Sequence, residues 1–198
     1  ILYLSNPPGF SRDSQRAALD LLRDLNERHY TSTGDLEVAS RIASYELAFR
    51  MQTSAPDLLD FSKEPASIRE MYGLDDGDAE NRQFAANCLL ARRMIERGVR
   101  FILMMDASWD DHTELNKKLP KRCAKIDRPT AALIQDLKQR GLLDETLLVW
   151  GGEFGRTPMV EIRKPEDADN AGRDHHPNAY SMWMAGGGLR GGTVVGRT

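Results

Sequence analysis

Apolar residues in the first third of the chain recur at the spacing of an α-helix. Ala18, Leu21, Leu22 and Leu25 fall on one side of a segment that runs to about residue 30, and this period of 3.6 residues predicts an amphipathic helix. The same period recurs further along the chain and predicts helices over about 35–53, 80–97 and 115–140. The first hundred residues are therefore predicted to be mainly helical.

Prolines interrupt this helical pattern at several places. Because proline lacks a backbone N–H and restricts its neighbours, we expect short turns over 56–59 and 65–72, each of which begins at a proline. Pro120 and Pro129 lie inside the last helical stretch and are expected to kink or divide it.

The second half of the chain contains apolar runs that are nearly continuous. The runs over 99–105 and 146–150 are typical of strands that are buried on both faces. A third strand is expected over 180–185, and a short fourth over 192–195. A strand, a helix and a second strand in succession form the parallel crossover unit. The pattern therefore predicts an α/β fold with a mostly parallel sheet and flanking helices.

These elements divide the chain into two predicted parts, a helical segment over 1–98 and a part over 99–198 that carries the sheet. The chain begins at Ile1 and lacks the basic and then apolar pattern of a signal peptide. We expect it to be an internal piece of a longer protein.

Composition excludes several classes of function. The 198 residues are 40% hydrophobic and 29% charged, as in a soluble globular protein, and the net charge of −3 argues against a nucleic-acid-binding surface. No apolar run is long enough for a membrane span. Two cysteines, Cys88 and Cys123, are too few for a disulfide scaffold, and both lie on apolar helix faces, where we expect them in the core.

Polar residues gather in three loops around the predicted strands. Ligands of open α/β sheets bind beyond the carboxyl ends of the strands, where the loops over 106–112 and 151–158 begin. A third polar segment, 172–178, precedes the third predicted strand. We expect these three loops to meet at one edge of the sheet.

The side chains in these loops are suited to binding a metal and an anion. The carboxylates and imidazoles are ligands that zinc, manganese and iron accept, and arginines can hold a phosphate or sulfate group through paired hydrogen bonds. The candidates are Asp106, Asp110, Asp111, His112, Glu153, Arg156, Arg173, Asp174, His175 and His176.

Each candidate also has a simpler interpretation. Asp110 and His112 are placed to cap the following helix, and Glu153 is placed to pair with Arg156. The His175-His176 dipeptide precedes a proline, as in a surface turn, and the residues before it could form a local Arg173–Asp174 pair. The convergence of the histidines on loops that are expected to meet favours a metal site.

Three motifs resemble a known family. WDDH at 109–112, GGEFGRTP at 151–158 and AGRDHHPNAY at 171–180 resemble the family catalogued as domain of unknown function 1501. Its members are sulfatase-like proteins of the alkaline phosphatase superfamily. The resemblance implies an α/β sandwich with one or two metals at the edge of a mostly parallel sheet, in a domain whose N-terminal part this chain lacks.

The resemblance also implies roles for individual residues. Asp110 and His112 are in the position of an Asp/His pair of metal ligands, and Glu153 follows the next strand, where the superfamily has an Asp-His pair. His175 resembles the late histidine ligand, with Asp174 and His176 as neighbouring ligands. Arg156 and Arg173 are the expected catalytic arginines that hold the anion. Phe154 stands in place of the superfamily's histidine, a change that would reduce a two-metal site to one.

These roles predict a metal-dependent hydrolase of phosphate or sulfate esters, with a divalent metal (zinc, calcium, manganese or magnesium) and a small-molecule or glycan ester as substrate. The superfamily's nucleophile segment is absent from the sequence, and of the nearby hydroxyls none is assigned that role. Group transfer at the same site is open, and the alternative is a non-catalytic binding or scaffold protein with the same fold. Family members are commonly exported, which implies a periplasmic location.

Overall fold

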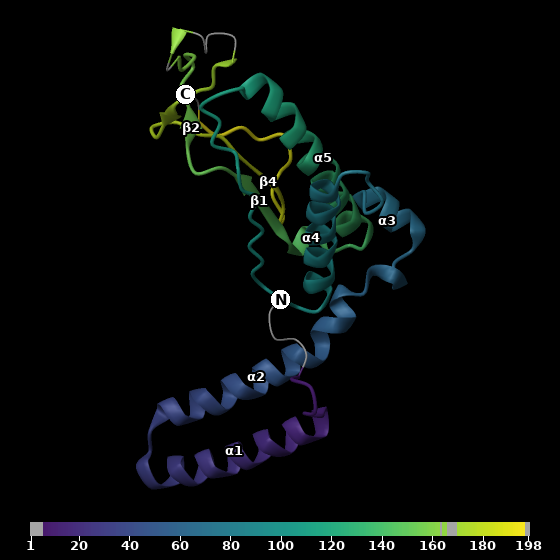
Figure 1. Cartoon of the computed structure of the whole chain (residues 1–198), viewed down its shortest axis with the longest axis vertical. Helices are drawn as coiled ribbons and strands as arrows, with labels where there is room; N and C mark the ends of the chain where they lie inside the picture. The colour runs from purple at the N-terminus through teal and green to yellow at the C-terminus, as the bar shows by residue number, and fades with distance from the viewer. Residues whose placement is uncertain (1–5, 163, 166–169, 197–198) are drawn as a thin grey trace. The chain divides into compact units, whose positions relative to one another are not determined.

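The computed structural model describes residues 6–162, 164–165 and 170–196. The chain forms two compact units, Ile1–Lys63 and Glu64–Thr198 (Figure 1). None of the helices in the described ranges is both long enough and apolar enough to cross a membrane.

The first unit is a helical hairpin. Helix α1 spans Arg12–Thr33 and helix α2 spans Leu36–Leu59, which confirms the two helices predicted here. The Ser11 side chain caps α1 by accepting a hydrogen bond from the Ser14 N–H. Gly34 ends α1 with a φ of 68°, a left-handed conformation that glycine adopts without steric cost.

Helix α2 is longer than the sequence predicts, because it continues through Pro56 instead of ending before the expected turn over 56–59. Pro56 lies in the last turn, and its carbonyl accepts a hydrogen bond from the Asp60 N–H at 3.2 Å. A proline so close to the end interrupts few backbone hydrogen bonds, which is why the helix survives it. A 3-10 turn, η1, follows at Phe61–Lys63.

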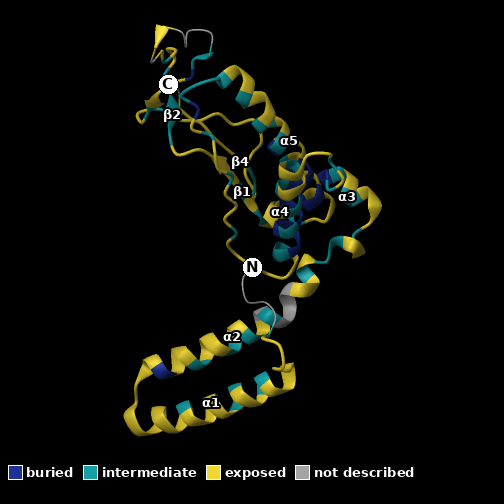
Figure 2. Ribbon diagram, in the orientation of Figure 1, coloured by how far each residue is buried: buried dark blue, intermediate teal, exposed yellow. Residues whose placement is uncertain are grey.

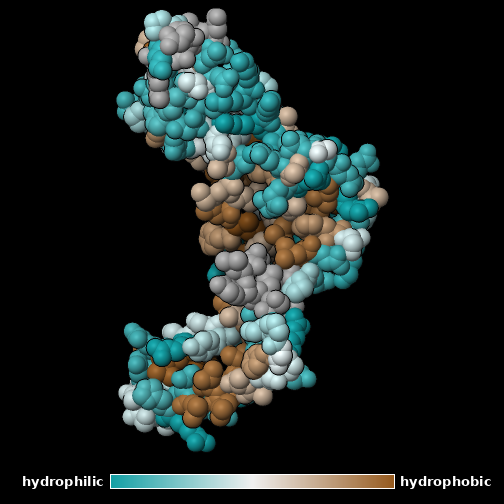
Figure 3. Space-filling model, viewed as in Figure 1, coloured by the Kyte–Doolittle hydropathy of each residue, from teal (hydrophilic) through white to brown (hydrophobic). Residues whose placement is uncertain are grey.

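One polar cluster joins the two helices of the hairpin. The Arg16 guanidinium donates to both carboxylate oxygens of Glu46, at 2.6 and 3.0 Å, and lies 4.9 Å from the centre of the Phe49 ring. The hydrogen bonds with Glu46 and Asp20 raise the pKa of Arg16. Apolar side chains gather between the helices (Figure 3), although Leu21 and Leu25 remain more than half exposed.

The core of the second unit lies between three helices, α3 (Ala66–Tyr72), α4 (Ala79–Glu96) and α5 (Leu115–Gln139). Helix α4 packs along α5, and α3 packs against both. Figure 2 shows the buried residues concentrated here. They include Tyr72, Ala85, Cys88, Leu89, Ala132, Leu133 and Leu137.

The two cysteines differ in their surroundings. Cys88 is fully buried, as predicted, and burial raises its pKa to about 12, whereas Cys123 is only half-buried. Helix α5 is a single helix through Pro120 and Pro129, so neither proline divides it. The division of the chain into parts over 1–98 and 99–198 stays a prediction. Helices α3 and α4 lie before residue 98 in the sequence, and they pack on α5, which lies after it.

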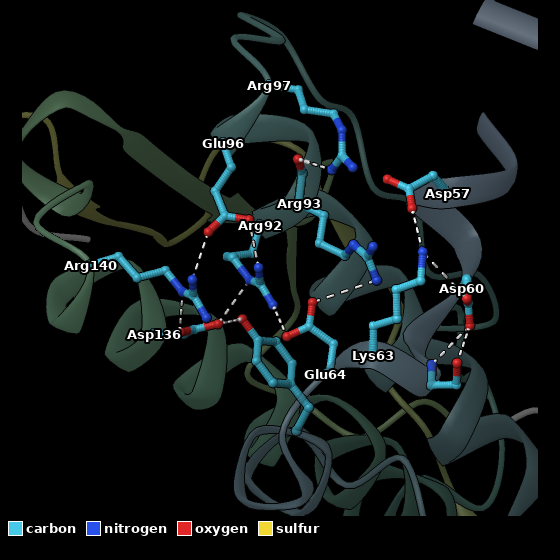
Figure 4. Close-up of polar contacts among 12 residues, drawn as sticks. Asp57, Asp60, Lys63, Glu64, Arg92, Arg93, Glu96, Arg97, Asp136 and Arg140 are labelled. Carbon is cyan, nitrogen blue, oxygen red and sulfur yellow. Dashed lines mark hydrogen bonds and ion pairs between the residues drawn. The ribbon is translucent and has the colours of Figure 1, made fainter. Parts of the chain in front are cut away.

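A buried ionic network ties the three helices together (Figure 4). The Arg92 guanidinium is 3% exposed and forms ion pairs with Glu64 at 2.6 Å, Glu96 at 2.6 Å and Asp136 at 3.0 Å. Asp136 is 1% exposed and also accepts hydrogen bonds from the Tyr72 hydroxyl, at 3.1 Å, and from the Arg140 Nε, at 2.7 Å. Each of the two buried charges therefore has several partners.

Two of the predicted strands are present and pair with each other. Strand β1 (Leu147–Gly151), which follows the 3-10 turn η2 (Leu143–Glu145), pairs with β4 (Met182–Gly186) in register Val149↔Met184. The pairing is antiparallel, so no parallel sheet occurs among the residues that the structure describes. The fold is mixed α/β, with a second two-stranded antiparallel sheet formed by residues 155–156 and 175–176.

Two other predicted strands are wrong for the described ranges, since 99–105 and 192–195 form no strand. Phe101, Leu103 and Met105 are 91, 84 and 83% exposed. An apolar run forms a strand only when a neighbouring strand pairs with its backbone, and the sheets of the described part leave this run out. Strand β1 is itself partly exposed, with Leu147 and Val149 half accessible, so it is not buried on both faces as predicted.

Candidate metal centre

The three polar loops predicted here do meet, but through antiparallel contacts and not at the edge of a parallel sheet. Strand β2 (Gly155–Arg156) pairs with β3 (His175–His176). Isolated bridges join Thr113 to Ala171 and Glu161 to Gly172. The Arg173 N–H donates to the Asp111 carbonyl at 3.2 Å. These contacts bring segments that are far apart in the sequence to one place.

Two glycines of the motifs permit this close approach. A Cβ atom at Gly172 would collide with the backbone of Asp111 and His112, and one at Gly155 would collide with the carbonyl oxygen of Ala179. Any larger residue at either position would push the loops apart. The glycines of the GRTP and GRDHHP motifs thus have a steric role in assembling the site.

Two carboxylates fix the first loop against α5. Asp111 is buried and accepts from the Arg122 guanidinium, while Asp106 pairs with Lys125 at 2.6 Å and accepts from the Trp109 indole N–H at 2.8 Å. Asp106 and Asp111 are therefore engaged with the helix. The simpler interpretation, in which Asp110 and His112 cap α5, is wrong, because the N-cap residue is Glu114 and no side chain caps the helix.

Asp110 is the centre of the site. Its Oδ1 lies 2.9 Å from His175 Nε2, 3.0 Å from His112 Nε2 and 2.7 Å from a guanidinium nitrogen of Arg156. The hydrogen bond from His175, then that from Arg156, and the charge of His112 lower the pKa of Asp110 to about 2. The carboxylate therefore stays ionised at neutral pH and keeps the negative charge that attracts a cation.

The rings of His112 and His175 lie close together, tilted by 31°. Their centroids lie 5.0 Å apart, and the Phe154 ring lies 4.9 Å from that of His175 on β3. The ligand atoms of Asp110, His112 and His175 all lie within 4.8 Å of each other, close enough to hold one metal ion. Two imidazoles and one carboxylate form a donor set that suits zinc and related divalent metals.

A second group shares His112. The Nδ1 atom of this ring lies 2.6 Å from Glu161 Oε2, and His112, Glu161 and Asp174 form another set within 4.8 Å. Sequence reasoning missed Glu161. It lies in a stretch of mixed charge between the GRTP and GRDHHP motifs, where a solvated loop was the natural expectation.

The arginines occupy different positions. Arg156 is 24% exposed, pairs with Asp110 and also donates to the carbonyl oxygens of Trp109 and Arg173. It thus pairs with Asp110 and not, as the simpler interpretation suggested, with Glu153. Arg173 is exposed and donates to the Thr157 carbonyl at 3.4 Å.

The remaining predicted ligands are Glu153 and His176. Glu153 is exposed in the loop between β1 and β2, and His176, in β3, pairs with Gly155 of β2. Neither belongs to the metal-binding groups that the described residues form. Of the six predicted ligands, Asp110, His112, Asp174 and His175 lie within these two groups.

The structure thus defines a mixed α/β protein with a group of histidine and carboxylate side chains that could hold a divalent metal. The chain belongs to the family described as a protein of unknown function (DUF1501), which it matches over residues 1–198. Neither the curated proteins nor the solved structures contain a match to it.

Proposed function

We propose that this protein is a divalent-metal-dependent hydrolase of phosphate or sulfate esters, with Asp110, His112 and His175 as metal ligands. The observation that supports it most is the position of Asp110 Oδ1, which lies within 3.0 Å of both Nε2 atoms and 2.7 Å from Arg156. When bound, such a metal polarises an ester oxygen and lowers the pKa of a bound water.

The protein's own side chains supply the rest of the proposed site. Arg156 already donates to the oxygen between the two histidines, so it lies where an anionic ester would meet the metal ligands. Its planar guanidinium can donate two parallel hydrogen bonds to a phosphate or sulfate group. Arg173 lies nearby through its backbone contact with Arg156 and would add positive charge for attracting the anion.

The experiment measures metal content and ester hydrolysis together. The purified protein is loaded with Zn²⁺ or Mn²⁺, the bound metal is measured by elemental analysis, and activity is assayed with aryl phosphates and aryl sulfates. His112→Ala and His175→Ala should each lower metal content and activity, and Glu145→Ala, an exposed acid in η2, should change neither. Full activity in both histidine variants would refute the site assignment.

A second candidate function is binding without catalysis. It is favoured by Phe154, whose ring lies against His175 in the loop where the superfamily resembled above has a further histidine ligand. A protein of this kind would bind Zn²⁺ with the same dependence on His112 and His175 but would hydrolyse none of the esters. The same experiment separates the two functions.

The proposal extends to substrate and location. A small-molecule or glycan ester is the proposed substrate, since the site is open at Asp110, which is exposed. Export to the periplasm is proposed from the family resemblance alone, and fractionation of the cells that make the protein would test it.

A further inference from the structure

The His112 ring has a carboxylate at each of its nitrogens. Asp110 Oδ1 lies 3.0 Å from Nε2, and Glu161 Oε2 lies 2.6 Å from Nδ1. The ring and the Glu161 side chain are each 20% exposed, so water reaches this hydrogen bond only in part. The question is which nitrogen faces the metal and which carries a proton.

The spacing of the atoms decides between the two sides. Two ligands on one zinc ion lie about 3.3 Å apart when each bond is roughly 2.0 Å and the geometry is tetrahedral. The atoms on the Asp110 side, at 2.9 and 3.0 Å, are near this value. The 2.6 Å separation at Nδ1 is that of a short hydrogen bond and leaves no room for a metal between the two atoms.

The shorter contact favours a proton on Nδ1. The carboxylates at the two ring nitrogens can only accept hydrogen bonds, and a neutral ring has one proton to donate. Nδ1 lies 2.6 Å from Glu161, whereas Nε2 lies 3.0 Å from Asp110 Oδ1, an oxygen that already pairs with Arg156 and His175. In the neutral ring the lone pair is then on Nε2, which faces Asp110 and His175. A carboxylate that orients a metal-binding histidine in this way typically raises metal affinity by ten- to a hundred-fold.

The backbone holds Glu161 in place for this role. The Glu161 N–H donates to the Gly172 carbonyl at 2.9 Å, and the two residues form an antiparallel bridge. Gly172 in turn packs against Asp111 and His112. Gly172 therefore links the backbone segment that carries the Glu161 carboxylate to the segment that carries His112.

We propose that Glu161 is a positioning residue, which holds His112 in the Nδ1–H form and so presents Nε2 to the metal. The metal part of this inference rests on the proposed function, whereas the proton position does not. Glu161 itself would not bind the metal. Asp174, the third member of that group, would lie outside the coordination sphere for the same reason.

The test combines NMR with zinc titration on the whole chain. In metal-free protein at a pH where the histidines are neutral, long-range ¹H–¹⁵N spectra should show His112 as the Nδ1–H tautomer. Glu161→Ala should shift His112 toward the Nε2–H tautomer and weaken Zn²⁺ binding by ten- to a hundred-fold. Glu161→Gln keeps an oxygen that accepts from Nδ1 and should retain the tautomer with a smaller loss of affinity. Glu145→Ala is the control.

The outcomes separate this inference from the proposed function. An unchanged tautomer in Glu161→Ala, with far-UV circular dichroism showing an intact fold, would overturn the positioning role even if zinc binds. If the wild type binds no zinc, the proposed function and the metal part of the inference fail together. The tautomer shift would then still establish that Glu161 orients His112.

Discussion

Asp136 offers the sharpest test of what stabilises the second unit. Its carboxylate is 1% exposed, pairs with Arg92 at 3.0 Å, and accepts from the Tyr72 hydroxyl and from Arg140. Asp136→Ala removes one partner of Arg92 and the acceptor of a buried hydroxyl. Breaking a buried ion pair costs about 3–5 kcal/mol, and a buried hydroxyl left without an acceptor costs about 1–3 kcal/mol.

The total is smaller than the sum of these terms, because Arg92 keeps Glu64 and Glu96 as partners. We therefore expect Asp136→Ala to lower the free energy of unfolding of this unit by about 3–5 kcal/mol. Asp136→Asn retains an acceptor for one donor and should cost about half as much. Asp127→Ala, at an exposed position on the same helix, should stay within about 0.5 kcal/mol of the wild type.

The assay is urea denaturation followed by tryptophan fluorescence. All three tryptophans, Trp109, Trp150 and Trp183, lie in the second unit, so the signal reports on this unit alone. Thermal unfolding should show a Tm lowered by about 10 °C or more for Asp136→Ala. If both Asp136 variants unfold at the same urea concentration as Asp127→Ala, the network does not stabilise the fold and the reasoning is refuted.

Three further predictions follow from the core and the site. Burial raises the pKa of Cys88 to about 12 and also raises the pKa of Tyr72. Their contribution to stability is therefore complete below their unfolded pKa values of about 8.5 and 10, and it is lost as pH rises toward the folded values. The free energy of unfolding should fall above about pH 9, less steeply in Cys88→Ala than in the wild type; equal dependence on pH in the two proteins would contradict this. Gly172→Ala should separate the loops and so weaken Zn²⁺ binding more than about tenfold, as measured by calorimetry. Gly191→Ala is the control and should leave Zn²⁺ binding unchanged, because a Cβ atom at Gly191 meets nothing within 4 Å. Arg156→Gln should weaken inhibition by inorganic phosphate about tenfold, since a charge-assisted hydrogen bond contributes about 1.5–3 kcal/mol. The affinity for Zn²⁺ should be retained. An equal loss of phosphate inhibition and of Zn²⁺ affinity would show that Arg156 only holds the metal ligands in place and does not bind the anion.

The four long helices, α1, α2, α4 and α5, could be predicted from the sequence because their signals are local, whereas helix α3 (Ala66–Tyr72) was expected to be a short turn. The apolar period, the serine and aspartate caps and the glycine at the end of α1 all act within a few residues. The continuity of α2 through Pro56 depends on how near the proline lies to the end of the helix, which the period alone does not show.

The strands were harder to predict, because a strand depends on a partner elsewhere in the chain. The runs over 99–105 and 146–150 have the same apolar character, yet only the second pairs, and its partner β4 is antiparallel. Nothing within either run distinguishes them. The expectation of a parallel sheet followed from the order of the elements and failed for the described residues.

The candidate site was predicted in part. His112 and His175 stand out because the chain has only four histidines, and Asp110 shares a short motif with His112; the structure brings the three together. Glu161 was missed because its importance lies in one contact with His112 Nδ1, and an acid in a charged loop carries no such signal. Glu153 was overestimated because its position relative to a strand suggested a ligand, while its side chain is exposed and outside both groups.

The site and the helical core differ in how they are built, and this has a consequence for local opening. His175 and Asp110 are 65 residues apart, and they are joined through strands of only two residues each. Closing such a loop costs chain entropy that short strands offset only weakly. We expect the amides of β2 and β3 to exchange with solvent far faster than those of α5, through partial unfolding that leaves the three helices intact. A ligand that binds only the closed form would slow this exchange in proportion to its concentration over its Kd. Hydrogen exchange at these few amides would therefore report occupancy of the site by any candidate ligand.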